Sequence, residues 1–251
     1  ETVRLKSMHI GTYFIIPLLV FCITPIITLV NAVSMLFVKN YVSSTITYVV
    51  TNNSFLLTLG LMALMPAIVE ELAFRGVILG NYRYSGALSG ILMSGFLFGL
   101  MHMNFNQMAY AVLLGIIFGI VLEATGSIIS TIEMHFCING SSVLLSYVSQ
   151  ALFSGKDYQS VNSQGQLDAA SLHTIINSYI NILPYALVFS CLLIYALAAI
   201  NKRQENLINI FRLKKKSDVT NDNDKVSVFS PLLIIVIIFC LGKCILDEFV
   251  L

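Results

Sequence analysis

The sequence predicts an all-α protein, a polytopic transmembrane helical bundle of about seven spans that forms a single membrane domain over residues 1–251. Of its 251 residues, 57% are hydrophobic and only 11% are charged. A soluble domain is typically about 45–50% apolar and about 25% charged. Apolar runs of about 20 residues, the length that crosses a bilayer as a helix, recur along the chain.

Each predicted span is an apolar run between turn-forming or charged segments. The first run is longer than the roughly 7–15 apolar residues of a signal-peptide core, so we expect a retained helix. Glycines four residues apart, in the third and fourth spans and at the turn before them, favour close packing of helices in lipid. The predicted spans are 12–38, 55–79, 88–104, 107–123, 127–149, 178–200 and 229–247, and the glycine pairs are Gly86/Gly90, Gly95/Gly99 and Gly115/Gly119.

Lysine and arginine predict which loops face the cytoplasm, because cytoplasmic loops are enriched in them. With seven alternating spans, all the richer loops fall on one side. We therefore expect an integral protein of a bacterial cell membrane with a cytoplasmic N-terminus, an outward loop at 150–177 and a basic cytoplasmic loop at 201–228. The inward residues are Arg4, Lys6, Arg83, Lys202, Arg203, Arg212, Lys214, Lys215 and Lys216, against Lys39 and Lys156 outside.

Cysteine count and net charge add little. Five cysteines, mostly inside apolar runs, do not predict a disulfide framework. A net charge of +1 points to no class of partner. The lipid bilayer is the expected surrounding, no nucleic acid is expected, and the sequence does not define an oligomeric state.

Three charges interrupt the second span, at Glu70, Glu71 and Arg75. A charged side chain in the middle of a bilayer costs about 2.5–3.5 kcal/mol on insertion scales. Glu71 and Arg75 are four residues apart on one helical face, so we expect an ion pair between them. Glu70 lies about 100° round the helix and has no such partner, which makes it the candidate for chemistry. The alternative is that all three charges serve only to join helices.

Other spans add polar residues that could meet Glu70. His102 ends the segment FLFGLMH, and His135 begins HFCIN, in which Asn139 lies one turn later. At about 1.5 Å of rise per residue, Glu70 and His135 lie about 15 Å and about 13 Å from the inner boundary.

His102 lies level with them if its helix starts near Gly90, and about 24 Å deep if it starts at Gly86. Level placement also brings the polar stretch Asn104–Gln107 to membrane depth. Polar backbone there requires surrounding protein or a water-filled cavity, so we expect a wet site inside the bundle.

Such a site suits hydrolysis. Glu70 can act as a general base on water and then as an acid to the leaving amine. His102 and His135 can position that water, bind a metal, or both, because two histidines and a carboxylate form a known hydrolytic zinc site. Asn139 can hydrogen-bond the scissile carbonyl or its oxyanion.

The sequence lacks the motifs that are typical of other intramembrane hydrolases. The sequence contains no H-E-x-x-H of a zincin and no serine in a G-x-S-x-G context. All six aspartates lie in predicted loops or near the end of the last span, which argues against an aspartyl dyad. A glutamate–histidine site remains.

Three motifs follow one another in the order E-E-x-x-x-R, F-x-x-x-H and H-x-x-x-N, at Glu70–Arg75, Phe98–His102 and His135–Asn139. In this order they resemble the CPBP family of intramembrane proteases, which includes the CAAX prenyl endopeptidases and bacterial proteins once grouped with bacteriocin self-immunity. The turn Ala124–Ser130 looks like the family's short turn. The resemblance covers residues 66–142.

The resemblance implies an intramembrane endopeptidase whose four-helix catalytic core lies at 66–142, with a membrane-associated peptide or protein as substrate. Loop charges favour presentation of that substrate from the cytoplasmic side. Both a metalloprotease and a metal-free glutamate mechanism are argued for the family. The resemblance implies Glu70, His102, His135 and Asn139 as catalytic residues, Glu71, Arg75 and Phe98 as their support, and Glu70, His102 and His135 as ligands if zinc is bound.

Two other functions are weighed. A non-catalytic membrane scaffold could bind or regulate a partner protein or peptide with the same bundle, but it would not need these buried ionisable groups. An ion or proton transporter also places Glu and His in the membrane. The sequence shows no inverted repeat, which ranks the transporter last.

Overall fold

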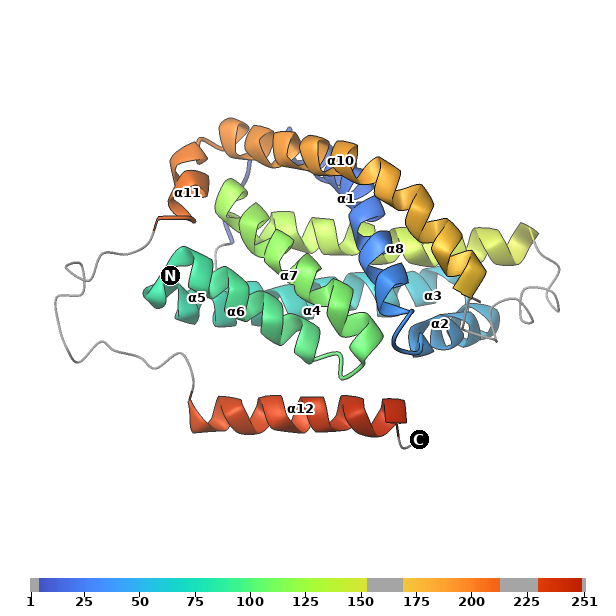
Figure 1. The fold of residues 1–251 in the computed structure, drawn as a ribbon. Coiled ribbons are helices and arrows are strands. Elements are labelled where there is room, and N and C mark those ends of the chain that lie inside the picture. The colour runs from blue at the N-terminus through green and yellow to red at the C-terminus, as the bar shows by residue number, and fades with distance from the viewer. Residues whose placement is uncertain (1–4, 153–168, 213–229, 250–251) are drawn as a thin grey trace.

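The computed structural model describes residues 5–152, 169–212 and 230–249, and in these ranges every regular element is a helix (Figure 1). This confirms the all-α fold. Five of the described helices are long and apolar enough to cross a membrane. They are α1 (Thr12–Ser34), the continuous helix Phe55–Tyr82, α7 (Phe105–Thr125), α8 (Ile128–Leu152) and α10 (Ala169–Ile200).

The other two predicted spans differ from these five. Helix α6 (Ala87–Leu100) has only 14 residues, about 21 Å of helix against about 30 Å of hydrocarbon. It starts at Ala87, with Gly86 as its N-cap, which agrees with the alternative of a start at Gly86 and not with a start near Gly90. Helix α12 (Pro231–Phe249) has 19 residues and carries Lys243, Asp247 and Glu248.

The structure differs from the prediction at the end of the first span and the start of the sixth, and it adds two short helices. Helix α1 ends at Ser34 rather than 38, and a short helix α2 (Tyr41–Asn52) follows that the sequence did not predict. Helix α10 begins at Ala169, so the part of the predicted outward loop from 169 to 177 is helical. Helix α11 (Gln204–Asn209) lies in the predicted basic loop. Residues 153–168 and 213–229 of these two loops lie outside the described ranges.

The second span is a single helix with two π-helical stretches. Proline 66 near the start of its middle α-helical part has no N–H to donate, which disturbs the regular hydrogen-bond ladder. π-Helical turns are uncommon and are often found at functional sites. The parts are α3 (Phe55–Leu59), η1 (Gly60–Leu64), α4 (Met65–Glu71), η2 (Leu72–Ile78) and α5 (Leu79–Tyr82), followed by the 3₁₀ turn η3 (Arg83–Ser85).

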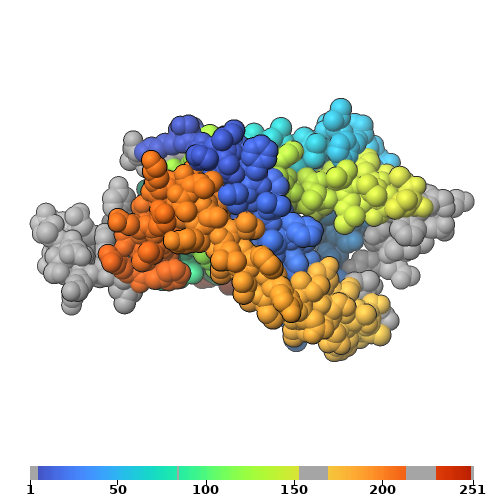
Figure 2. Space-filling model, turned by 90° about the horizontal axis from the view of Figure 1, so that it is seen from above, coloured from blue at the N-terminus to red at the C-terminus, as the bar shows by residue number. Residues whose placement is uncertain are grey.

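The helices pack as two layers around a shared core. Helix α6 runs back along α7, and α10 packs across α1 on the face that Figure 2 presents. Ile16 and Leu19 of α1 are fully buried against Phe118 and Val121 of α7. The second span packs along α8, and both also contact α7.

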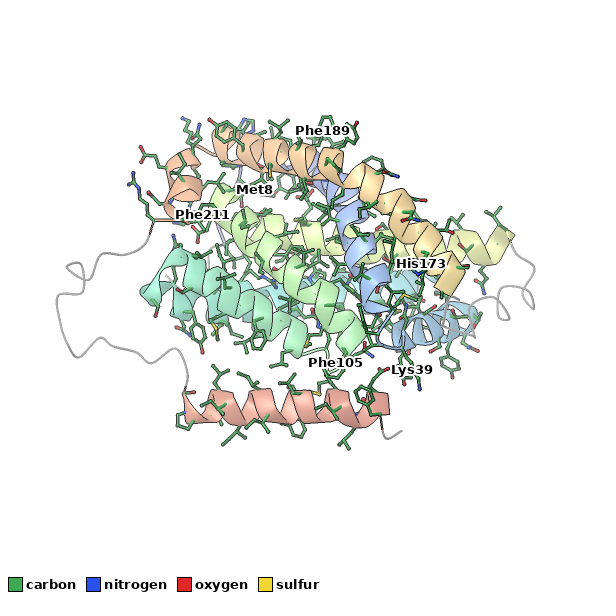
Figure 3. The ribbon with its side chains drawn as sticks, in the orientation of Figure 1. Met8, Lys39, Phe105, His173, Phe189 and Phe211 are labelled. Atoms are coloured by element: carbon green, nitrogen blue, oxygen red, sulfur yellow. The ribbon has the colours of Figure 1, made fainter. Side chains whose placement is uncertain are left out.

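The loops that carry Arg83 and Arg203 lie at the same end of the bundle. Both arginines approach the buried carboxylate of Glu123 at the end of α7, at 3.0 Å and 3.8 Å. Figure 3 shows Lys39 at the opposite end from Phe211, which follows α11. The two inward loops predicted from charge therefore share one side, while its assignment to the cytoplasm stays a prediction.

Close contact between α6 and α7 depends on glycine. A Cβ atom on Gly115 would lie 2.6 Å from the Cα of Gly95, and one on Gly99 would lie 2.9 Å from the backbone N of Val112. This confirms the predicted close packing for these glycines. Gly86 differs, because its φ of 120° places it in the turn before α6.

We expect Gly99→Ala to destabilise the protein by about 1–3 kcal/mol, because its methyl group would push against the backbone of α7. Thermal unfolding of the purified protein in detergent measures the loss. Gly242→Ala on α12 is the control, since a Cβ there meets nothing within 4 Å. Equal melting temperatures for the two variants would contradict the close approach of α6 and α7.

Candidate active site

A buried ion pair lies at the centre of the site. Arg75 Nη1 donates to Glu71 Oε1 at 3.0 Å, and both side chains are completely buried. Arg75 Nη2 also donates to the carbonyl oxygen of Gly115 at 3.1 Å. The guanidinium lies over the rings of Phe98 and Phe118, at 4.4 Å and 4.9 Å, where cation–π attraction adds to its stabilisation. The predicted pair is confirmed, and it connects three helices: the second span, α6 and α7.

His135 shares the same carboxylate. Its Nδ1 lies 3.0 Å from Glu71 Oε1, and its ring stacks on Phe118 with centroids 5.4 Å apart. A carboxylate that is paired with an arginine accepts hydrogen bonds and does not donate them. Nδ1 therefore donates to Glu71, and in the neutral tautomer with its hydrogen on Nδ1 the other nitrogen, Nε2, is a hydrogen-bond acceptor.

Glu70 faces Nε2 of His135. Its Oε2 lies 3.9 Å from His135 Nε2, and its side chain is 23% exposed while that of Glu71 is 0% exposed. Adjacent residues on a helix point about 100° apart, so one glutamate is buried in the ion pair and the other reaches an accessible space. The prediction that Glu70 stays outside the Glu71–Arg75 pair is confirmed.

Phe98 connects the two histidines. Its buried ring meets His102 edge to face at 5.2 Å and His135 at 5.8 Å. His102 Nδ1 lies 2.8 Å from the carbonyl oxygen of Phe98, one turn earlier. Because that carbonyl can only accept, Nδ1 donates and Nε2 of His102 also keeps a lone pair. Although α6 starts at Ala87 and not near Gly90, His102 is next to the site through its contact with Phe98.

Asn139 lies one turn beyond His135 and borders a cavity of about 430 Å³. Its Nδ2 donates to the carbonyl oxygen of Met62 at 3.3 Å. In a regular helix that carbonyl would accept from residue 66, but Pro66 has no N–H. Proline thus leaves the Met62 carbonyl free to hold the asparagine, and the second Nδ2 hydrogen remains available.

The residues do not form a zinc site as they lie. Two ligand atoms on one tetrahedral zinc lie about 3.3 Å apart, whereas Glu70 Oε2 and His135 Nε2 are 3.9 Å apart. Within the described part of the chain, no three His, Cys, Asp or Glu side chains are grouped closely enough for a metal ion. We therefore derive no step through a metal.

The sequence did not single out two groups that form the site. Phe118 packs against both His135 and Arg75, yet nothing distinguishes it from other phenylalanines in an apolar span. Its place on one helical face with Gly115 was the only signal. The Met62 carbonyl was equally hidden, although Pro66 four residues later marks it.

A family model described as type II CAAX prenyl endopeptidase, Rce1-like, matches residues 52–141. Over these residues the chain is similar to the Rce1-like family. The Rce1-like segment contains every residue of the site from Glu70 to Asn139, which confirms the resemblance to the CPBP and CAAX proteases. At the family level it indicates a CAAX-type intramembrane protease, and with the five apolar helices it supports an integral membrane protein. No curated protein and no solved structure matches the chain.

We expect Arg75→Ala in the Rce1-like segment to cost about 3–5 kcal/mol of stability, because it leaves the buried Glu71 carboxylate without its counter-ion. Folded yield after detergent extraction and thermal unfolding measure this loss. Lys243→Ala is the matched control, since it breaks a half-exposed pair with Asp247 that is worth about 0–1 kcal/mol. A normal melting temperature for Arg75→Ala would contradict a structural role for the ion pair.

Proposed function

We propose that the chain is an intramembrane endopeptidase that hydrolyses a peptide bond in a membrane-associated peptide or protein. One observation carries the proposal: two hydrogen-bond acceptors, Glu70 Oε2 and His135 Nε2, face each other at 3.9 Å. A separation beyond about 3.5 Å between polar atoms suits a bridging water. Water donates one hydrogen to each acceptor and leaves its oxygen lone pairs directed away from both.

In this proposal Glu70 is the general base that takes a proton from the water as it attacks the scissile carbonyl, and it then returns the proton to the leaving amine. His135 holds the water, and the Glu71–Arg75 pair holds the ring of His135 in the tautomer that makes this possible. His102 supports the site through Phe98, because its ring meets that of Phe98 edge to face at 5.2 Å and Phe98 meets His135 at 5.8 Å.

Asn139 stabilises the transition state by donating its free Nδ2 hydrogen to the oxyanion. A donor that is already fixed in position does not have to reorganise during the reaction, which is the source of its catalytic effect. The hydrogen bond from the same Nδ2 to Met62 supplies that fixation.

We expect Glu70→Gln to lower cleavage at least about 10²-fold, because the amide cannot take a proton from water. The assay uses the purified full chain in detergent, a library of membrane-anchored peptides, and mass spectrometry of the products. Glu133→Gln is the matched control, since it makes the same change in another membrane carboxylate, on α8 outside the site.

Metal analysis of the same preparations tests the zinc form of the proposal, in which Glu70, His102 and His135 are the ligands. About one zinc per chain, and activity lost to a chelator and restored by zinc, would support it. Activity without bound metal supports water activation by glutamate. Equal product profiles for wild type and Glu70→Gln would contradict a Glu70 peptidase and favour a scaffold that binds its partner without cleaving it.

We expect Asn139→Leu to lower kcat by about 10²–10³-fold and to change KM little, because an oxyanion donor acts mainly in the transition state. Steady-state kinetics on one peptide from the library separate the two constants. Ser141→Ala, an exposed position on the same helix, should leave both unchanged. A large rise in KM with normal kcat would instead assign Asn139 to substrate binding.

A further inference from the structure

A cavity lies beside Asn139, between the helices of the bundle. It measures about 430 Å³, within the usual range of about 300–1,000 Å³ for ligand pockets. Its walls come from α1, α2, η1, α7 and α8. Neither Glu70 nor His135 lines the cavity. The cavity meets the proposed site at Asn139.

The lining has an unusual chemistry for a cavity between membrane helices, because it is polar without being charged. Five amides and six hydroxyls face it, and the remaining lining residues are apolar. The amides are Asn31, Asn40, Asn106, Gln107 and Asn139; the hydroxyls are Thr28, Ser43, Thr47, Tyr110, Ser142 and Ser146; the apolar residues are Ile27, Val42, Ile46, Met62, Leu114, Ile138 and Val143.

The deepest amide is held in place and has an unused acceptor. Asn106 is 1% exposed, and its Nδ2 donates to Asn31 Oδ1 at 2.9 Å and to Ser34 Oγ at 2.7 Å. Among the described residues nothing donates to Asn106 Oδ1, although that atom is buried. A buried acceptor without a donor costs about 1–3 kcal/mol, so the two hydrogen bonds that Nδ2 donates are what hold this amide in the cavity wall.

The cavity also lies at one particular end of the bundle. The end of α1, the beginning of α7 and helix α2 form it, whereas Arg83, Arg203 and Glu123 mark the opposite end. Lys39, at the junction of α1 and α2, lies at the cavity end in Figure 3. The loop charges favoured presentation of the substrate from the basic side. The position of the cavity argues for the opposite side.

We propose that this cavity is the subsite for an uncharged, polar, extended peptide segment next to the scissile bond, presented from the end of the bundle opposite Arg83 and Arg203. The inference rests on the proposed peptidase function. An extended segment leaves its backbone N–H and C=O groups without partners, and inside a membrane protein each of them needs one. Amides supply both donors and acceptors, and the hydroxyls supply more.

The same lining discriminates against two other ligands. A lysine or aspartate on the segment would be desolvated without a counter-ion, because no lining residue is charged. A prenyl chain would cover the amides and leave their hydrogen bonds unmade, which also costs free energy. The cavity therefore selects neutral polar peptide over charged peptide and over an isoprenoid.

Photo-crosslinking tests the proposal independently of cleavage. The protein is the full chain with Glu70→Gln, and the probe is a membrane-anchored peptide whose flanking segment contains Ser, Asn, Thr and Gly with one benzophenone residue. We expect crosslinks to the α7 and α8 positions that line the cavity, such as Gln107 and Ser142. Two further probes carry Lys and Asp in that segment or a farnesylated cysteine in its place, and we expect at least tenfold lower yields from them.

Substitutions in the cavity provide the control. Gln107→Leu should lower the yield of the neutral probe at least fivefold, whereas Gln204→Leu, the same change on α11 at the opposite end, should not alter it. Crosslinks outside the cavity, or equal yields from the three probes, would overturn the subsite.

Cleavage separates this proposal from the function on which it rests. Wild-type cleavage of all three probes at similar rates, lost in Glu70→Gln, would leave the peptidase standing and overturn the subsite. Selective crosslinking of the neutral probe without any wild-type cleavage would retain the subsite and overturn the peptidase.

Discussion

The shared carboxylate of Glu71 is the interaction on which the rest of the site depends. One oxygen atom accepts from Arg75 and from His135, each at 3.0 Å. Because the arginine keeps that carboxylate an acceptor, the proton of His135 must lie on Nδ1. The histidine thus turns Nε2 toward Glu70, in an arrangement similar to the carboxylate–histidine pairs that orient catalytic and metal-binding imidazoles.

Helix packing makes this ion pair possible inside a membrane. A guanidinium buried there needs hydrogen-bond acceptors, and one of the acceptors of Arg75 is the backbone carbonyl of Gly115. That carbonyl is reachable because Gly95 and Gly115 let α6 and α7 approach until no Cβ would fit between them. The small residues that first suggested only helix packing therefore also position the charge network.

The sequence predicted the helical fold and most of the site because those features depend on local spacing. Glu71 and Arg75 pair as residues four apart, and Glu70 stays outside the pair by the geometry of one helix. The start of α6 and the presence of α2 could not be read from apolar runs, since both depend on turns and on packing. His102 reaches the site through the ring of Phe98, a tertiary contact that counting along the helix does not reveal.

The cavity could not be predicted for a related reason: its lining comes from five separate helical segments, and only Asn104–Gln107 suggested polar surroundings. Its neutrality nevertheless follows from the chemistry next to it. An additional positive charge one turn from His135 would compete with Arg75 for Glu71 or would pair with Glu70, in surroundings that screen charge weakly. Uncharged amides can bind a polar peptide without disturbing that network. The separation of a charged, rigid centre from a neutral, hydrogen-bonding cavity thus allows both to exist within one membrane domain.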